Sequence, residues 1–176
     1  MKSKLARLFS LLWFMTALVP QLSSAAHVPN LAGTFHLVAE QSDDIDQAID
    51  RAIAPMNLLI RPFARSRLEK INRPYQRLMI GATANDIVVV ADPRTPIQTP
   101  LNGAPIKWQR EDGEPFNVSG AWDGTVFEQT FVSGTGRRVN RYSVSTDGQT
   151  LTLHVVITGG GLPGAMTYQL VYRRVS

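Results

Sequence analysis

The chain has 176 residues, contains no cysteine and carries a formal net charge of +4. The lack of cysteine in this sequence excludes disulfides, thiolate metal sites, a cysteine nucleophile and the lipid-modified cysteine of bacterial lipoproteins. The charge is concentrated at the N-terminus: without the three basic residues Lys2, Lys4 and Arg7 it falls from +4 to +1. The overall charge is therefore a poor argument for a nucleic-acid partner or an anionic membrane, and no nucleic-acid partner is expected.

The N-terminal segment is typical of a secretory signal peptide. The basic residues precede an apolar run over residues 8–19, and residues 24–26 supply the small side chains that a signal peptidase requires. The run is too short to span a bilayer, which takes about 20 residues. We expect residues 1–26 to be a cleaved signal peptide. Residues 27–176 should then form one domain, exported to a periplasm or to the extracellular medium. A retained N-terminal anchor is the alternative.

The first predicted element of the domain is a strand over residues 31–39, where apolar residues occupy every second position. A helical insert is predicted over residues 43–73, because apolar residues there recur at spacings of three and four. Asp44 and the glutamine three residues after it have the spacing of a capping box. Pro55 and Pro62 each remove a helical hydrogen bond, so two or three short helices are expected rather than one.

The insert and the residues after it are rich in basic side chains, namely Arg51, Arg61, Arg65, Arg67, Lys70, Arg73 and Arg77. One interpretation is the solvated face of an amphipathic helix. The other is a docking surface for an anionic membrane or an acidic partner, through Arg61, Arg65 and Arg67. Few aromatic residues are interleaved with these cations, so a stacking platform for nucleic-acid bases is not predicted.

After residue 76 the apolar period changes to two. Tight-turn dipeptides separate the segments at Asn102-Gly103, Asp112-Gly113, Asp123-Gly124 and Asp147-Gly148. Segments 77–82 and 86–91 are expected to pair as a hairpin, and a weaker, proline-flanked strand is expected between residues 95 and 101. The pattern predicts a mostly β protein, an up-and-down antiparallel barrel of eight to nine strands with sequential pairing. Such a barrel is either filled by side chains or encloses a small cavity.

Residues with catalytic or metal-binding potential are few and scattered. Neither a metal-ligand motif nor a nucleophile motif is present in the sequence, and the three histidines are too dispersed for a metal site. We expect no catalytic residues, no metal and no cofactor. Aromatic residues on predicted strands are expected either to pack the core or to line a ligand pocket. Arg141 would orient a ligand if its side chain pointed inwards. The candidate ligand-binding residues are Trp108, Trp122, Phe127, Tyr142, Tyr168 and Arg141.

Three segments resemble lipocalin-like proteins. Residues 31–35 are similar to the family's Gly-x-Trp opening, with Phe35 in place of tryptophan. Residues 171–174 resemble the final strand, whose arginine covers that aromatic ring. Residues 141–152 are similar to a segment of small exported bacterial lipocalin-like domains. The resemblance implies a barrel whose mouth or lumen holds a small apolar ligand. The helical insert departs from the family pattern and is expected to act as a lid or plug; the helix that usually follows the barrel is missing from this sequence.

The sequence thus predicts an exported, non-enzymatic protein that binds a small apolar or amphipathic molecule in a barrel. The alternative is an envelope interaction protein that docks anionic surfaces or partners through its basic helical insert. An enzyme of unrecognised type is a third hypothesis.

Overall fold

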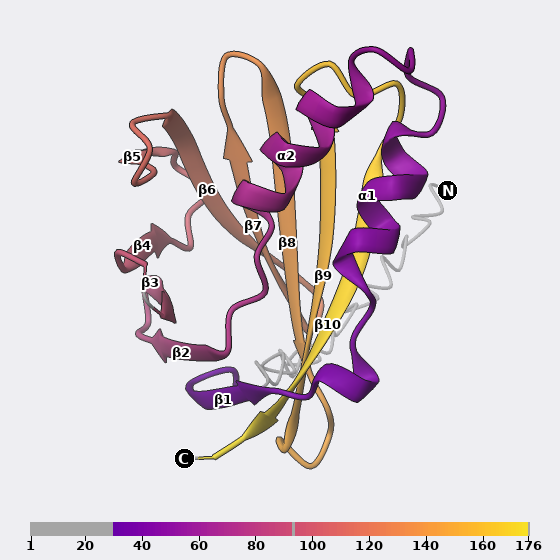
Figure 1. Ribbon diagram of the computed structural model, residues 1–176. Coiled ribbons are helices and arrows are strands. Elements are labelled where there is room, and N and C mark those ends of the chain that lie inside the picture. The colour runs from indigo at the N-terminus through magenta and orange to yellow at the C-terminus, as the bar shows by residue number, and fades with distance from the viewer. Residues whose placement is uncertain (1–29, 93, 176) are drawn as a thin grey trace, which may run out of the picture.

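The computed structural model describes residues 30–92 and 94–175; the predicted signal peptide and its cleavage site lie outside these residues (Figure 1). The helical elements are η1 (Ala39–Gln41), α1 (Ile45–Ile53) and α2 (Arg61–Ile71). The strands are β1 (Gly33–Leu37), β2 (Arg77–Ala82), β3 (Asp86–Asp92), β4 (Ile97–Pro100), β5 (Ile106–Gln109), β6 (Pro115–Asp123), β7 (Val126–Val132), β8 (Gly136–Val144), β9 (Thr150–Gly159) and β10 (Met166–Arg174).

All of the described strands belong to one antiparallel sheet of ten strands, ordered β4-β3-β2-β1-β10-β9-β8-β7-β6-β5. The first and last strands pair directly, and the sheet curls into a nearly closed barrel. The prediction of a mostly β, up-and-down antiparallel barrel is confirmed, but its count of eight to nine strands is wrong. The proline-flanked segment that was weakly predicted is a true strand, β4. It tolerates Pro100 because it pairs on one side only, with β3.

Sequential pairing fails at one place. β4 and β5 follow each other along the chain, yet no ladder joins them, and they form the two ends of the sheet. Pro100 and Pro105 near these ends have no N–H to donate, which limits pairing there. Side chains bridge the opening instead: Gln129 of β7 donates to the hydroxyl of Thr99 of β4 at 2.8 Å, and both residues are fully buried.

The helical insert follows β1 and forms two short helices that cover one side and one end of the barrel (Figure 1). The predicted cap is confirmed, because the Asp44 carboxylate accepts the backbone N–H groups of Asp46 at 2.8 Å and Gln47 at 3.2 Å. Pro55 lies just after α1, and Pro62 occupies the first turn of α2, where its missing N–H costs no hydrogen bond. No helix in residues 30–92 and 94–175 is long and apolar enough to cross a membrane.

Core side chains fill the end of the barrel opposite α2, and the same core continues to the helices, which contribute Ile49, Ile53 and Leu68. Alternate residues of the strands point inwards, and Phe35, Leu151 and Tyr172 are fully buried there. The guanidinium of Arg174 lies 4.5 Å from the centre of the Phe35 ring. It also donates to the carbonyl of Ala32 at 2.5 Å, so β10 holds the start of β1 in place. The expectation that the last strand's arginine covers this aromatic ring is therefore confirmed.

Candidate ligand-binding site

A cavity of about 150 Å³ lies at the other end of the barrel, beneath α2. Ala64, Leu68 and Ile71 of α2 form its roof, and Ile97, Phe131 and Ile157 are among the strand residues that line it. The turns that join β3 to β4, β5 to β6, β7 to β8 and β9 to β10 surround its mouth. The helical insert is therefore placed as a cover over the barrel.

The polar floor of the cavity is organised around Arg138 of β8. Its Nε donates to Oδ1 of Asn140 at 2.8 Å, its Nη1 to Oδ1 of Asn72 at 3.0 Å, and its Nη2 to the hydroxyl of Tyr168 at 3.2 Å. The Tyr168 hydroxyl in turn donates to Asn72 at 3.1 Å. Asn72 sits at the end of α2, Asn140 on β8 and Tyr168 on β10, so one helix end and two strands contribute the partners of this guanidinium.

The network continues across the barrel through neutral groups. Asn140 donates to the hydroxyl of Tyr142 at 3.2 Å, and this hydroxyl donates to Oε1 of Gln129 at 3.2 Å. Gln129 then reaches Thr99 at the gap in the sheet. Buried polar groups are costly unless they are hydrogen-bonded, and here each has a partner.

Arg138 has no acidic partner: no ion pair in the described part of the chain includes it. Burial acts to lower the pKa of Arg138, but the surrounding oxygens of Tyr168, Tyr75 and Tyr142 outweigh burial and leave its pKa raised, so the guanidinium stays charged. Burial raises the pKa of Tyr142 and Tyr168, which therefore remain neutral hydrogen-bond donors. The site is thus a positive charge held by neutral groups.

Other charges around the cavity have the same sign. Five arginines line it, against a single acidic residue, Glu114; the arginines are Arg67, Arg94, Arg110, Arg137 and Arg138. Arg94 lies over the ring of Tyr75, 4.7 Å from its centre. An excess of one sign of charge in a cleft attracts ligands of the opposite sign.

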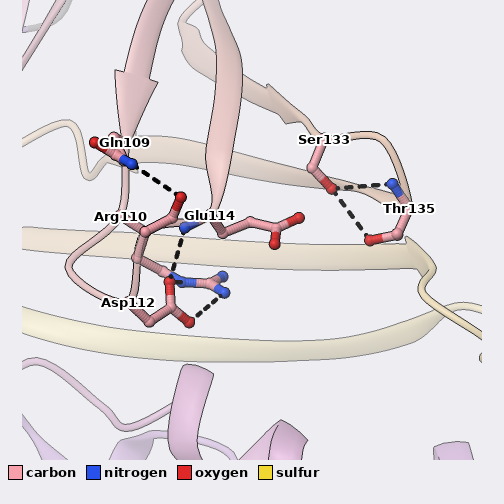
Figure 2. Close-up of polar contacts among 7 residues, drawn as sticks. Gln109, Arg110, Asp112, Glu114, Ser133 and Thr135 are labelled. Carbon is pink, nitrogen blue, oxygen red and sulfur yellow. Dashed lines mark hydrogen bonds and ion pairs between the residues drawn. The ribbon is translucent and has the colours of Figure 1, made fainter.

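The mouth is bordered by the β5–β6 and β7–β8 turns, which Figure 2 shows facing each other. Arg110 folds back onto the carboxylate of Asp112 with two hydrogen bonds, of 2.8 and 2.7 Å. The hydrogen bond from Arg110 is the main cause that lowers the pKa of Asp112 to about 2. Glu114 extends into the space between this turn and Ser133 (Figure 2).

An aromatic cluster forms one wall. The ring centres of Trp108 and Phe116 are 5.9 Å apart, those of Trp108 and Phe131 5.9 Å, and those of Phe116 and Phe131 6.2 Å. All of these rings line the cavity. They supply apolar surface beside the charged floor, which is the arrangement that an amphipathic ligand requires.

The residues predicted to bind ligand have different surroundings in the structure. Trp108 and Tyr142 line the cavity, and Tyr168 contacts it indirectly, through the hydrogen bond to Arg138. Trp122 and Phe127, with ring centres 5.7 Å apart, lie in the packed core and do not line the cavity.

Arg141 does not orient a ligand inside the barrel. Its guanidinium lies on the outer face of β8 and pairs with the carboxylate of Glu128 at 2.9 Å. The inward-pointing alternative for this residue is therefore corrected. The physical reason is the strand period of two: Tyr142 points inwards, so the residue before it points outwards, and Asn140 and Arg138 share the inner face.

Arg138, Asn140, Asn72 and Gln129 were not predicted from the sequence. Counting back from Tyr142 in steps of two would have found Arg138 and Asn140. Asn72 and Gln129 carry no comparable signal, since their positions depend on how the helix and the strands pack. Among the described residues, no group of three or more His, Asp or Glu side chains could hold a metal ion.

Fewer arginines of the helical insert are free to bind an anionic surface than the sequence suggested. The Arg65 guanidinium pairs with Asp50 and, at 2.7 Å, with Glu69. Arg61 donates to the backbone carbonyls of Ala54 and, at 2.9 Å, Met56. Arg67 is exposed and lines the cavity. Two of the three arginines expected to dock an anionic surface are therefore engaged within the protein.

The fold resembles that of several solved structures. The protein described as "REP1-NXSQ fatty acid transporter" superposes with a TM-score of 0.52 at 17% sequence identity, over 84% of this chain and 97% of that one. Fatty-acid-binding protein 1 of Echinococcus granulosus gives 0.50 and 13%, over 82% of this chain and 97% of that one. A secretary abundant heat soluble (SAHS) protein of Ramazzottius varieornatus gives 0.59 and 10%, over 84% and 96%. At these identities the likeness shows the barrel fold alone. The amino-acid sequence matches no protein-family model and no curated protein.

Proposed function

We propose that this barrel binds a small amphipathic molecule that has an apolar part and an anionic head group, such as a carboxylate, and that it performs no chemistry on that ligand. The observation that carries the proposal is Arg138, a charged guanidinium under the cavity whose protein partners are all neutral. An arginine has about five N–H donors, and a carboxylate can accept two of them side by side.

The electrostatics and the lining support an anionic amphiphile over a neutral one. Three N–H groups of Arg138 are used within the protein, which leaves donors for a ligand oxygen. Asn72 and Tyr168 hold the guanidinium in place, so little side-chain entropy is lost on binding. The aromatic cluster of Trp108, Phe116 and Phe131 then faces the apolar part of the ligand.

The size of the cavity limits what it encloses. A volume of about 150 Å³ is comparable with an engineered apolar cavity that accepts benzene and lies below the ~300 Å³ at which ligand pockets usually begin. The cavity therefore holds the head group and the first part of a chain. A longer chain leaves through the mouth between α2 and the strand turns.

Two further features of the proposal come from outside the site. The similar barrels described as a fatty acid transporter and a fatty-acid-binding protein support an apolar ligand and a binding role rather than an enzymatic one. Export to a periplasm or the extracellular medium is part of the proposal and stands on the signal-peptide pattern of residues 1–26 alone.

The test compares matched ligands and matched variants. Delipidated protein is titrated calorimetrically with dodecanoic acid and with dodecanol, which differ only in the head group. Arg138→Gln should weaken binding of the acid about 10- to 100-fold, since a hydrogen bond to a charged group contributes about 1.5–3 kcal/mol. Binding of the alcohol should change little.

Arg141→Gln is the control, because it removes an arginine from the same strand on the opposite face. Its affinities should equal those of the unmodified protein. The proposal fails if the acid and the alcohol bind equally well, or if both arginine variants lose the same affinity. Unchanged binding of the alcohol to the Arg138→Gln protein shows that this variant is folded.

A further inference from the structure

The connection between α1 and α2 exposes large apolar side chains. Leu58 is 72% exposed, Leu59 80%, Ile60 49% and Phe63 77%. Single exposed apolar residues are common on protein surfaces and do not indicate a binding site. A contiguous group of them marks an interaction site. We call these four residues the apolar tip. They lie within six consecutive residues, so the exposed apolar side chains are grouped along the chain at one turn and the helix start after it.

The backbone of the tip is held in this position. The Asn57 side chain accepts the N–H of Leu59 at 2.9 Å, and the Asn57 carbonyl accepts the N–H of Ile60 at 3.1 Å. Arg61 braces the same turn by donating to the carbonyls of Ala54 and, at 2.9 Å, Met56. The leucines therefore face outwards on an ordered turn, and they cannot reach the core without breaking these bonds.

The charges near the tip are positive. No acidic residue occurs between Asp50 and Glu69, and Arg51 and Arg67 are exposed within this stretch. Neither forms an ion pair with the described residues. An apolar centre with a cationic margin fits the interface of a bilayer that contains anionic lipids. A second copy of the chain fits less well, because a symmetric contact through the tip would bring equal positive charges together.

We propose that the apolar tip is a docking surface for anionic lipid bilayers, with Leu58, Leu59 and Phe63 inserting into the interface. This differs from docking by arginines alone, since Arg61 and Arg65 are engaged within the protein. The opposite face of α2 carries Ala64, Leu68 and Ile71, which roof the cavity. Docking through the tip would place the mouth of the cavity beside the lipid. The proposal does not depend on which ligand the cavity holds.

Co-sedimentation with phosphatidylcholine vesicles, with and without phosphatidylglycerol, tests the surface. The unmodified protein should bind the vesicles that contain phosphatidylglycerol. Leu58→Ser with Leu59→Ser should reduce this binding at least tenfold, because burial of a leucine side chain contributes about 1.5–3 kcal/mol. Arg51→Gln with Arg67→Gln should weaken binding about 30-fold, and only to the anionic vesicles, since each cation near such a surface contributes about 1 kcal/mol.

Val175→Ser is the matched control, because Val175 is 56% exposed just after β10, and its N–H donates to the carbonyl of Thr34 in β1, away from the tip and from the cavity mouth. It should bind vesicles like the unmodified protein. The proposal is overturned if the unmodified protein does not bind, or if the double leucine variant binds as well as it does. Loss of a concentration-dependent dimer in that variant, without any vesicle binding by the unmodified protein, would instead identify a second copy as the occupant. Dodecanoic acid should bind the leucine variant normally, so failure here is distinguishable from failure of the ligand proposal.

Discussion

At the scale of single residues, the chemistry of this barrel depends on which face of a strand a side chain occupies. Arg138 and Arg141 are three positions apart on β8, and an odd separation places them on opposite faces. The outer arginine pairs with Glu128 in contact with solvent, where an ion pair contributes little. The inner one is surrounded by neutral acceptors and keeps its charge available to a ligand.

Gly120 lies where β6 approaches β4, and this position leaves no room for a side chain. A Cβ atom added there would lie 2.6 Å from Cγ2 of Thr99 and 3.0 Å from the Phe127 ring. We expect Gly120→Ala to lower the free energy of unfolding by about 1–3 kcal/mol, the usual cost of overpacking a core. Denaturant unfolding measures this.

Two comparisons separate the clash from a general effect of replacing glycine. Gly134→Ala should leave stability nearly unchanged, because no atom lies within 4 Å of the added carbon. Thr99→Ser removes the clashing methyl group and keeps the hydroxyl that accepts from Gln129. The double variant Gly120→Ala, Thr99→Ser should therefore recover part of the lost stability. If the double variant loses as much unfolding free energy as the two single variants lose together, or more, the close contact with Thr99 is not the cause.

At the scale of elements, the β5–β6 turn combines structure with the electrostatics of the mouth. Asp112 is exposed, and its carboxylate fixes the turn by accepting two hydrogen bonds from Arg110 and one, at 3.3 Å, from the backbone N–H of Glu114. The same arginine lies over Phe116, 5.3 Å from the ring centre, and so connects the turn to the aromatic wall. The turn is thus ordered by charge at its tip and by aromatic packing at its base.

The Arg110–Asp112 pair predicts a local pH dependence. The folded pKa of Asp112 is about 2, below the ordinary aspartate value of about 3.9. Because the folded pKa is depressed, the pair stabilises the fold at neutral pH, and this contribution is lost as pH falls from about 4 to about 2. Carbon-detected NMR of the Asp112 carboxyl should show its midpoint near 2.

Replacing Arg110 should shift the titration midpoint of the Asp112 carboxyl. Arg110→Gln should raise the pKa of Asp112 toward the ordinary range, because its main cause of depression is removed. Arg137→Gln removes a different arginine of the cavity lining, one that pairs with Glu128, and should leave the midpoint of Asp112 where it was. A midpoint in the ordinary range in the unmodified protein would contradict the pairing.

At the scale of the whole molecule, the strands of the barrel differ in how extensively they are hydrogen-bonded to their neighbours. The longest ladders join β8, β9 and β10, whose pairing extends over most of each strand. β4 and β5 are short, each pairs on one side only, and no ladder joins them. The network from Thr99 to Arg138 runs between this gap and the site, so opening of the gap would disturb the cavity floor.

Native-state hydrogen exchange should reveal this asymmetry. Amides of β4 and β5 should exchange through local opening, with protection at least tenfold lower than that of β9, which should exchange only when the whole protein unfolds. Addition of dodecanoic acid should raise protection at the gap if Arg138 anchors the ligand. Equal protection in β4 and β9 would show that the gap is as stable as the ladders and would contradict the prediction.

Much of this fold is determined by the sequence alone, because its signals are local. Period-two segments and Asp-Gly turns specify the antiparallel strands, Asp44 specifies the start of α1, and the prolines specify where the helices break. The family resemblance predicted that an arginine of residues 171–174 covers Phe35, and the structure shows that it is Arg174. The site is not local: the inward direction of Arg138, the approach of Asn72, and the engagement of Arg65 by Asp50 and Glu69 arise when distant segments pack. The exposure of Leu58 and Leu59 is likewise decided by tertiary structure, since an apolar run has the same pattern whether the core covers it or not.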